Sequence, residues 1–163
     1  MKPNFYIPSR SECQALIKQS EAFYCVTRKI KGQLVELYDY RLASYSDFFP
    51  EDGSNWAELR GLTFVQDPQT HQWECNILMQ KFFNINQTTD WMYNDVKDKK
   101  ITKLQNKEDG SIISFVRFNN RNIKAKSKMS FESSQAVMAQ ELYDNSETLK
   151  QFVYECIYAN VTP

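Results

Sequence analysis

The sequence contains few of the residues that interrupt regular structure or build metal sites. Its 163 residues include only four glycines, five prolines and one histidine, which argues against linkers and low-complexity tails. Cys13, Cys25, Cys75 and Cys156 are scattered without a C-x-x-C pair, and the single His71 lies in a turn-like segment. A structural zinc site is therefore not expected.

Long apolar runs and a net charge are also missing. No run approaches the roughly 20 apolar residues that span a bilayer, and the start MKPNFYIPSR lacks an apolar stretch of signal-peptide length. These absences predict a protein without a membrane segment, with free thiols in a reducing cytoplasm. Twenty basic and twenty acidic residues cancel, so the overall charge neither favours nor excludes nucleic acid as a partner.

The residues that are present suit one globular domain, with 42% apolar and 25% charged side chains. Their pattern predicts an α+β fold with mainly antiparallel sheets and a few packing helices, because successive strands leave no room for regular βαβ alternation. Ser9 and Glu12 fit a capping box at the start of a helix over about residues 10–20. The aromatic and β-branched runs 22–30 and 33–40 predict a strand hairpin.

The remaining elements follow from similar patterns. A polar stretch, residues 88–98, allows a helix, and Ser130 or Ser133 could cap a helix through SQAVMAQELY. Further strands are predicted at LRGLTFVQ (59–66), WECNILM (73–79), ITKLQ (101–105), SIISFVRF (111–118), NIKAKSK (122–128) and QFVYECIYA (151–159).

The stretch NKEDGSIISF allows two interpretations of Lys107. Asp109-Gly110 between two predicted strands is a strong hairpin-turn signal, and exposed charges are common around such turns. A lysine nucleophile needs more, because an amine with a pKa near 10.4 is almost entirely protonated at pH 7. Burial or nearby cations would have to lower that pKa, so a reactive Lys107 is expected in a pocket with other basic residues.

Several stretches, taken together and in order, distinguish these interpretations. These stretches are LASYSDF (42–48), ELRGLTFV (58–65), MQKFFNIN (79–86), KEDGSIISF (107–115) and KSKMSFESSQAVMAQEL (126–142). Together they resemble the phage-type RNA ligase 1 family, and the resemblance extends from about Leu42 to Glu155. The KxDG signature is shared with DNA ligases and capping enzymes, whereas SYSDF and MQKFFN are specific to the RNA ligase 1 branch.

The resemblance implies a nucleotidyltransferase (ligase and capping-enzyme) fold and an ATP-dependent RNA ligase. In this family Lys107 would attack the α-phosphate of ATP to form a lysyl-AMP. The AMP would pass to an RNA 5′-phosphate, and an RNA 3′-hydroxyl would then displace it. Asp109 would orient the nucleophile, and Glu108 would be one of the residues that bind ATP. Gly110 would permit an unusual φ or a close approach of the nucleotide.

Basic positions of the family are expected around the phosphates. Arg60, Lys81 and Lys128 match residues that contact the triphosphate, and Lys126 is a weaker candidate near it. Their cations, together with Mg²⁺ held mainly by phosphates and waters, would stabilise the charge that develops during phosphoryl transfer. FVYECIY resembles the family's third motif, in which Glu155 on a core strand would accept a hydrogen bond from the ribose hydroxyl.

The family continues with motifs that do not follow Glu155 in this sequence, among them an aromatic platform for adenine and a pair of lysines. The expectation is therefore that residues 1–163 form the N-terminal part of an adenylyltransferase domain. Such a chain would be inactive, or active only with a second polypeptide that supplies the missing motifs. The RNA substrate would be associated with repair of RNA ends.

An alternative function is binding without catalysis, in which the chain holds a nucleotide or RNA. Basic residues alternate with Phe115 and Phe118 along the two strands 111–118 and 122–128, which could face a phosphate backbone. The same alternation is typical of any half-buried strand. A DNA ligase or capping enzyme would share KxDG but lack the MQKFFN-like segment.

Overall fold

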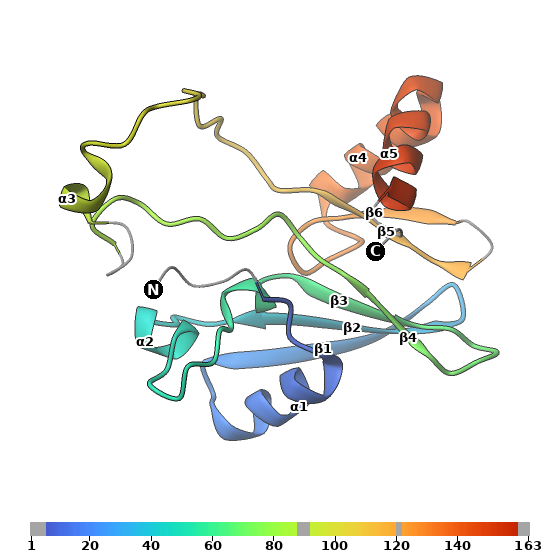
Figure 1. The fold of residues 1–163 in the computed structure, drawn as a ribbon. Coiled ribbons are helices and arrows are strands. Elements are labelled where there is room, and N and C mark those ends of the chain that lie inside the picture. The colour runs from blue at the N-terminus through green and yellow to red at the C-terminus, as the bar shows by residue number, and fades with distance from the viewer. Residues whose placement is uncertain (1–5, 88–91, 120–121, 160–163) are drawn as a thin grey trace.

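The computed structural model describes residues 6–87, 92–119 and 122–159. Two antiparallel sheets and several helices make up these residues, which confirms the predicted α+β fold (Figure 1). In chain order the elements are α1 (Arg10–Gln19), β1 (Phe23–Ile30), β2 (Gln33–Tyr40), α2 (Tyr45–Phe48), η1 (Ala57–Leu59), β3 (Leu62–Gln66), β4 (Trp73–Asn76), α3 (Tyr93–Val96), β5 (Ser114–Arg117), β6 (Ile123–Lys126), α4 (Ser134–Asn145) and α5 (Glu147–Ala159).

The first half of the chain forms an antiparallel meander in the order β1-β2-β3-β4. The β1–β2 pairing ends with Ile30 opposite Gln33. Lys31 and Gly32 form the two-residue turn between them, and both have positive φ, at 49° and 83°. Such a turn matches the right-handed twist of the two strands, so the predicted hairpin is confirmed.

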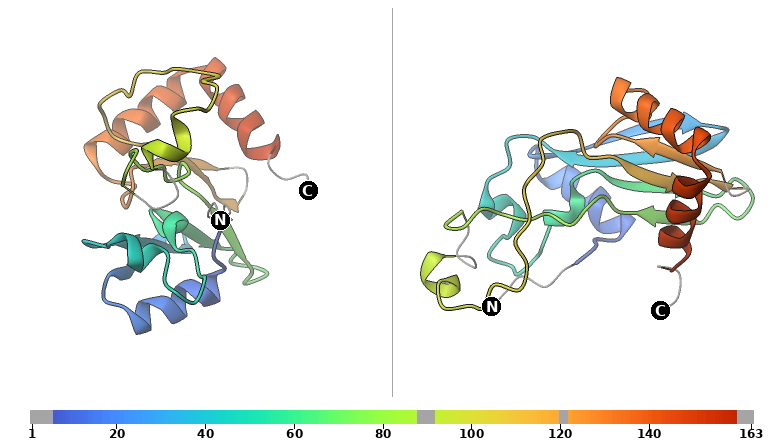
Figure 2. Two further views of the ribbon diagram at one scale, coloured as in Figure 1. Left: turned by 60° about the vertical axis from the view of Figure 1, so that its left-hand side comes forward. Right: turned by 90° about the horizontal axis from the view of Figure 1, so that it is seen from above.

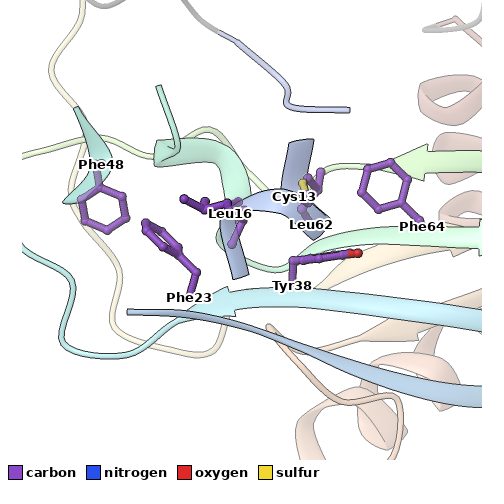
Figure 3. Packing of buried hydrophobic residues seen from close by; sticks show 8 residues of the cluster. Cys13, Leu16, Phe23, Tyr38, Phe48, Leu62 and Phe64 are labelled. Carbon is purple, nitrogen blue, oxygen red and sulfur yellow. The ribbon is translucent and has the colours of Figure 1, made fainter. Parts of the chain in front are cut away.

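Helix α1 begins and packs as the sequence predicts. Ser9 is its N-cap, and the backbone N–H of Ser9 donates to Glu12 Oε2 at 2.8 Å to complete the capping box. Cys13 and Leu16 of α1 are buried against one face of the four-stranded sheet (Figure 3). The helix therefore covers that face and builds the first core with aromatic side chains of the sheet.

The opposite face of the four-stranded sheet packs on the two-stranded sheet β5-β6, with α4 and α5 beyond it (Figures 1 and 2). Val35 and Leu37 of β2 share this second core with Val116 of β5. Tyr38 of β2 points to the first core. Because both faces are covered, β2 is buried almost continuously, as is usual for a strand between two packed layers.

Helix α4 confirms the predicted C-terminal helix. Its N-cap is Ser133, whose side chain accepts a hydrogen bond from the N–H of Ala136 at 3.2 Å. Gln140 accepts a hydrogen bond from the backbone N–H of Ala125 at 2.8 Å, which ties the helix to β6. None of the described helices is both long and apolar enough to cross a membrane.

The strand predicted at residues 151–159 is wrong, because these residues lie in helix α5. β-Branched and aromatic side chains suggested a strand, but Leu149, Val153 and Ile157 recur every four residues and form one helical stripe. Val153 is buried. Ser146 starts the helix, since its side chain accepts from the N–H of Leu149 at 3.2 Å. Tertiary packing and this cap outweigh the local strand propensity.

Other predicted elements are shorter than expected. The strand predicted over 59–66 begins only at Leu62, and the one over 73–79 ends at Asn76. The helix allowed over 88–98 is reduced to α3, and residues 88–91 lie outside the described residues. The strand predicted at 101–105 is absent, because residues 101–113 form no regular element. Residues 77–87 and 92–113 run out beyond the sheets and back, with α3 far from both sheets (Figure 1).

Candidate functional site

Three of the predicted basic residues gather where β2 ends and β3 begins. Tyr38 of β2 pairs with Leu62 of β3. Tyr40 is the last residue of β2, and Arg60 lies two residues before β3. Lys81 arrives from the segment after β4, and Lys128 from the turn after β6. We call Arg60, Lys81 and Lys128 the cationic cluster.

Tyr40 is the common neighbour of two members of the cationic cluster. Its hydroxyl accepts a hydrogen bond from Lys81 Nζ at 3.2 Å. The ammonium groups of Lys81 and Lys128 lie 5.3 and 5.2 Å from the centre of the Tyr40 ring. At these distances the negative face of an aromatic ring attracts a cation. Tyr40 thus holds two like charges near one another.

Further aromatic rings surround the ammonium of Lys81. It lies 5.1 Å from the centre of the Phe48 ring and 4.8 Å from that of Phe83. Phe48 belongs to the SYSDF stretch and Phe83 to the MQKFFN stretch, so two segments of the sequence signature meet at this lysine. Neither ring was singled out from the sequence. Phe83 lies two residues after Lys81, which could have suggested it, whereas Phe48 is brought to Lys81 only by the fold.

Glu58 fixes the backbone that carries Lys81. Its carboxylate is buried and accepts hydrogen bonds from the N–H of Lys81 at 3.0 and 3.3 Å. Burial raises the pKa of Glu58, and the charges of Arg60 and Lys81 oppose that rise. Arg60 Nη2 also donates to the carbonyl of Met79 at 3.0 Å. The ELRG and MQKFFN stretches are therefore joined by two polar contacts.

Asp39 is the anionic partner of Lys128. Its carboxylate is only 1% exposed, and Oδ2 lies 2.7 Å from Lys128 Nζ, whose side chain is 46% exposed. Tyr24 donates a weaker hydrogen bond to the same oxygen at 3.4 Å. Asp39 Oδ1 has no hydrogen-bond partner among the described residues. The sequence signal for Asp39 was an acidic residue inside the apolar strand 33–40, and our sequence reasoning missed it.

Lys126, the weaker candidate for a position near the triphosphate, is 0% exposed. Its ammonium donates to the carbonyls of Gly61 at 2.9 Å, Lys128 at 3.1 Å and Ser127 at 3.4 Å. Burial lowers its pKa to about 8, partly opposed by the charge of Asp39. The ammonium therefore lies beside the backbone of the cationic cluster and is hydrogen-bonded to carbonyls.

Gly61 lets the ELRG stretch and the KSK turn touch. Its φ is +67°, in the left-handed region that favours glycine. A Cβ at this position would lie 2.9 Å from the carbonyl oxygen of Lys128 and 3.0 Å from Leu78 Cδ2. A side chain here would therefore separate the two segments that supply Arg60 and Lys128.

Lys107 does not lie in the cationic cluster. It belongs to residues 101–113, which are irregular, and the neighbouring Glu108, Asp109 and Gly110 are exposed as well. The expected pocket around Lys107 is therefore absent from the described residues, and so is the expected hairpin. Gly110 has open space around its Cα and no positive φ.

The reason for this exposure lies in the composition of the segment. Between Lys99 and Gly110 the apolar residues are Ile101 and Leu104, whose side chains are 77% and 89% exposed. With neither packed on a sheet, little hydrophobic burial offsets the entropy of ordering the backbone. The turn signal at Asp109-Gly110 is therefore not sufficient to form a hairpin.

Glu155 lies on α5 rather than on a core strand. Its exposed carboxylate accepts a hydrogen bond from Gln151 Nε2, one helical turn earlier, at 2.6 Å. The argument that assigned it to the ribose depended on the strand, which the structure replaces with a helix. Within the described ranges there is no group of three or more His, Cys, Asp or Glu side chains that could hold a metal ion.

The stretches that form this site also match a known protein family. A family model described as RNA ligase matches residues 58–163. Because this match covers more than half of the sequence, the chain belongs to the RNA ligase family. The resemblance to the phage-type RNA ligase 1 family is thereby confirmed. All three members of the cationic cluster lie inside the matched range, as does the KEDG stretch.

We predict that Gly61→Ala destabilises the chain more than Gly32→Ala does. Both positions have positive φ, but a Cβ at Gly32 meets nothing within 4 Å. The shared backbone strain therefore cancels in the comparison. The added overlap at Gly61 should lower the free energy of unfolding by about 1–3 kcal/mol relative to Gly32→Ala, measured by urea denaturation. Equal losses in the two variants would contradict the close approach.

A second prediction concerns alkaline pH. The unfolded chain keeps Lys126 near its ordinary pKa of 10.5, whereas burial lowers the folded value to about 8. Between these values the unfolded state binds more protons, so this lysine makes the free energy of unfolding rise with pH, by about 3 kcal/mol across the window.

Urea denaturation between pH 7.5 and 10 should show this rise in the difference between the free energies of unfolding of the parent chain and Lys126→Met, because the other titrating groups are common to both. Lys29→Met removes an exposed strand lysine and serves as the matched control, which should keep the parent slope. An unchanged slope in Lys126→Met would contradict the burial of the charge.

Proposed function

We propose that the chain carries the nucleophile of an ATP-dependent RNA ligase. In the first step the neutral amine of Lys107 attacks the α-phosphorus of ATP. A nitrogen–phosphorus bond forms, the bond to the bridging oxygen breaks, and pyrophosphate leaves. The lysine gives up its proton to solvent. The product is an AMP group held on Lys107. In the second step an RNA 5′-phosphate attacks this AMP and Lys107 leaves. In the third step an RNA 3′-hydroxyl attacks the activated 5′-phosphate and AMP leaves.

The observation that supports this proposal is the cationic cluster within a chain of the RNA ligase family. Lys81 and Lys128 come from separate stretches and meet at the Tyr40 ring, and the charges of Arg60 and Lys81 both act on Glu58. Arg60 and Lys81 are half-buried and Lys128 is exposed, so all three side chains are at least partly accessible to a ligand. Fixed cations stabilise the negative charge that phosphoryl transfer spreads over phosphate oxygens.

Lys107 must approach this cluster for the reaction to occur, and its tether permits the approach. Ser114, at the start of β5, pairs with Lys126, which is two residues from Lys128. Lys107 precedes Ser114 by seven residues, and seven extended residues span at most about 25 Å. The exposed segment 101–113 makes no regular structure that would have to break first. Nearby cations would then also favour the neutral amine.

In this proposal Mg²⁺ binds together with the nucleotide and not at a separate site of the protein. The described residues offer no cluster of carboxylates for it, and Mg²⁺ commonly binds through substrate phosphates and waters. Its chemical contribution would be to neutralise charge on the phosphates. Asp109 would orient the amine and Glu108 and Gly110 would contact the nucleotide, as the family resemblance implies.

A second candidate function is binding of a nucleotide or RNA without adenylylation. One observation favours it: Lys107 lies on an exposed segment outside the cationic cluster. In that case the cluster would bind phosphates, and Lys107 would form no bond to the nucleotide. The two functions differ in whether a covalent bond forms between Lys107 and AMP.

We predict that the purified chain, incubated with ATP labelled at the α-phosphate and Mg²⁺, becomes covalently labelled with AMP, either alone or together with a polypeptide that supplies the family motifs expected after Glu155. Lys107→Ala should lower the labelled fraction to background, because the nucleophile is gone. Lys103→Ala is the matched control, since Lys103 is equally exposed on the same segment, and it should label as the parent chain does. The label is measured by gel autoradiography and located by peptide mass spectrometry.

The outcomes separate the two functions. Label that survives in Lys107→Ala would contradict the assigned nucleophile. A parent chain that binds ATP but takes up no label, whether alone or with such a polypeptide, would contradict the ligase proposal and favour binding without catalysis.

A further inference from the structure

The ammonium of Lys126 joins two parts of the chain that are 65 residues apart in sequence. It donates to the carbonyl of Gly61 from one side and to the carbonyls of Ser127 and Lys128 from the other. A lysine ammonium has three N–H donors, and three carbonyls receive them. No donor is left for a phosphate oxygen.

The carbonyls that Lys126 holds belong to the backbone of the cationic cluster. Gly61 follows Arg60 directly, and the third carbonyl is that of Lys128 itself. Gly61 has no side chain that would push the Lys128 carbonyl away. The buried ammonium therefore fixes the spacing between the two stretches on which the guanidinium of Arg60 and the ammonium of Lys128 stand.

Charge at this position is balanced by Asp39. Its carboxylate pairs with Lys128 Nζ at 2.7 Å and also attracts the ammonium of Lys126. A buried cation is costly unless it is paired and hydrogen-bonded. Three carbonyls and a nearby anion meet that requirement.

We propose that Lys126 is a positioning residue that clamps the carbonyls of Gly61 and Lys128, so that Arg60 and Lys128 face one triphosphate together, while Lys126 itself never touches the nucleotide. This inference rests on the proposed function for its consequence in nucleotide binding. The clamp itself does not depend on that function.

The clamp is tested first without nucleotide, by hydrogen exchange of backbone amides read by mass spectrometry. In Lys126→Met, peptides covering residues 60–63 and 126–131 should exchange faster than in the parent chain, because the two stretches lose their link. Lys29→Met is the control and should leave both peptides unchanged. Parent-like exchange in folded Lys126→Met would overturn the clamp.

The consequence for nucleotide binding is tested by a double-mutant cycle with a non-hydrolysable ATP analogue. Lys126→Met and Lys128→Met should each weaken binding, the former by about 10- to 100-fold through misplacement. The double variant should lose less than the product of the two single losses, because one lysine acts through the other. Losses that multiply, as expected for two independent phosphate contacts, would overturn the positioning role.

A measurement on the parent chain keeps the proposal falsifiable if Lys126→Met does not fold. With an amine-reactive acetylating ester, Lys128 should be modified and then protected by the analogue, whereas Lys126 should stay unmodified in both conditions. Modification of Lys126 that the analogue prevents would overturn the proposal. A parent chain that binds no analogue would overturn the proposed function and the nucleotide part of this inference, while the exchange result still tests the clamp.

Discussion

The close approach of Gly61 to the carbonyl of Lys128 is the contact on which the candidate site depends. Arg60 lies just before β3 of the four-stranded sheet, and Lys128 follows β6 of the two-stranded sheet. Glycine allows the two backbones to meet, and the buried ammonium of Lys126 bonds both of them. The packing of the two sheets therefore fixes the spacing between the stretches that carry Arg60 and Lys128.

Holding several cations together in the folded chain requires compensating groups. The compensating groups are aromatic rings, buried carboxylates and backbone carbonyls. Tyr40 lies near Lys81 and Lys128, Glu58 binds the backbone of Lys81, and Asp39 pairs with Lys128. The carboxylates are hydrogen-bonded within the protein, while Lys128 remains exposed. A phosphate ligand would add the negative charge that this arrangement lacks on its solvent side.

Sequence patterns predicted the parts of the fold that local chemistry determines. The capping box at Ser9, the Lys31-Gly32 turn and the helix after Ser133 each depend on residues close together in the chain. The strand predicted at 151–159 failed because a helical stripe of three apolar residues outweighed β propensity. The hairpin predicted around Lys107 failed because a turn signal does not form strands when the flanking residues have nothing to pack on.

Motif order also predicted three basic residues of the site, and the structure brings them together. It did not reveal Asp39, Tyr40, Glu58 or the burial of Lys126, because each of these depends on contacts between residues far apart in sequence. A lysine looks the same in sequence whether it faces solvent or three carbonyls. Lys126 and Lys128 can be distinguished only in the folded chain, where the KSK turn packs on Gly61, buries Lys126 and leaves Lys128 exposed.

The central claim is that the cationic cluster recognises phosphates. Isothermal titration of the chain with ATP and with adenosine, under the same conditions, tests it most directly. If the cluster binds the triphosphate, ATP should bind at least about tenfold more tightly, a difference of about 1.4 kcal/mol or more. Equal affinities for ATP and adenosine would contradict the claim.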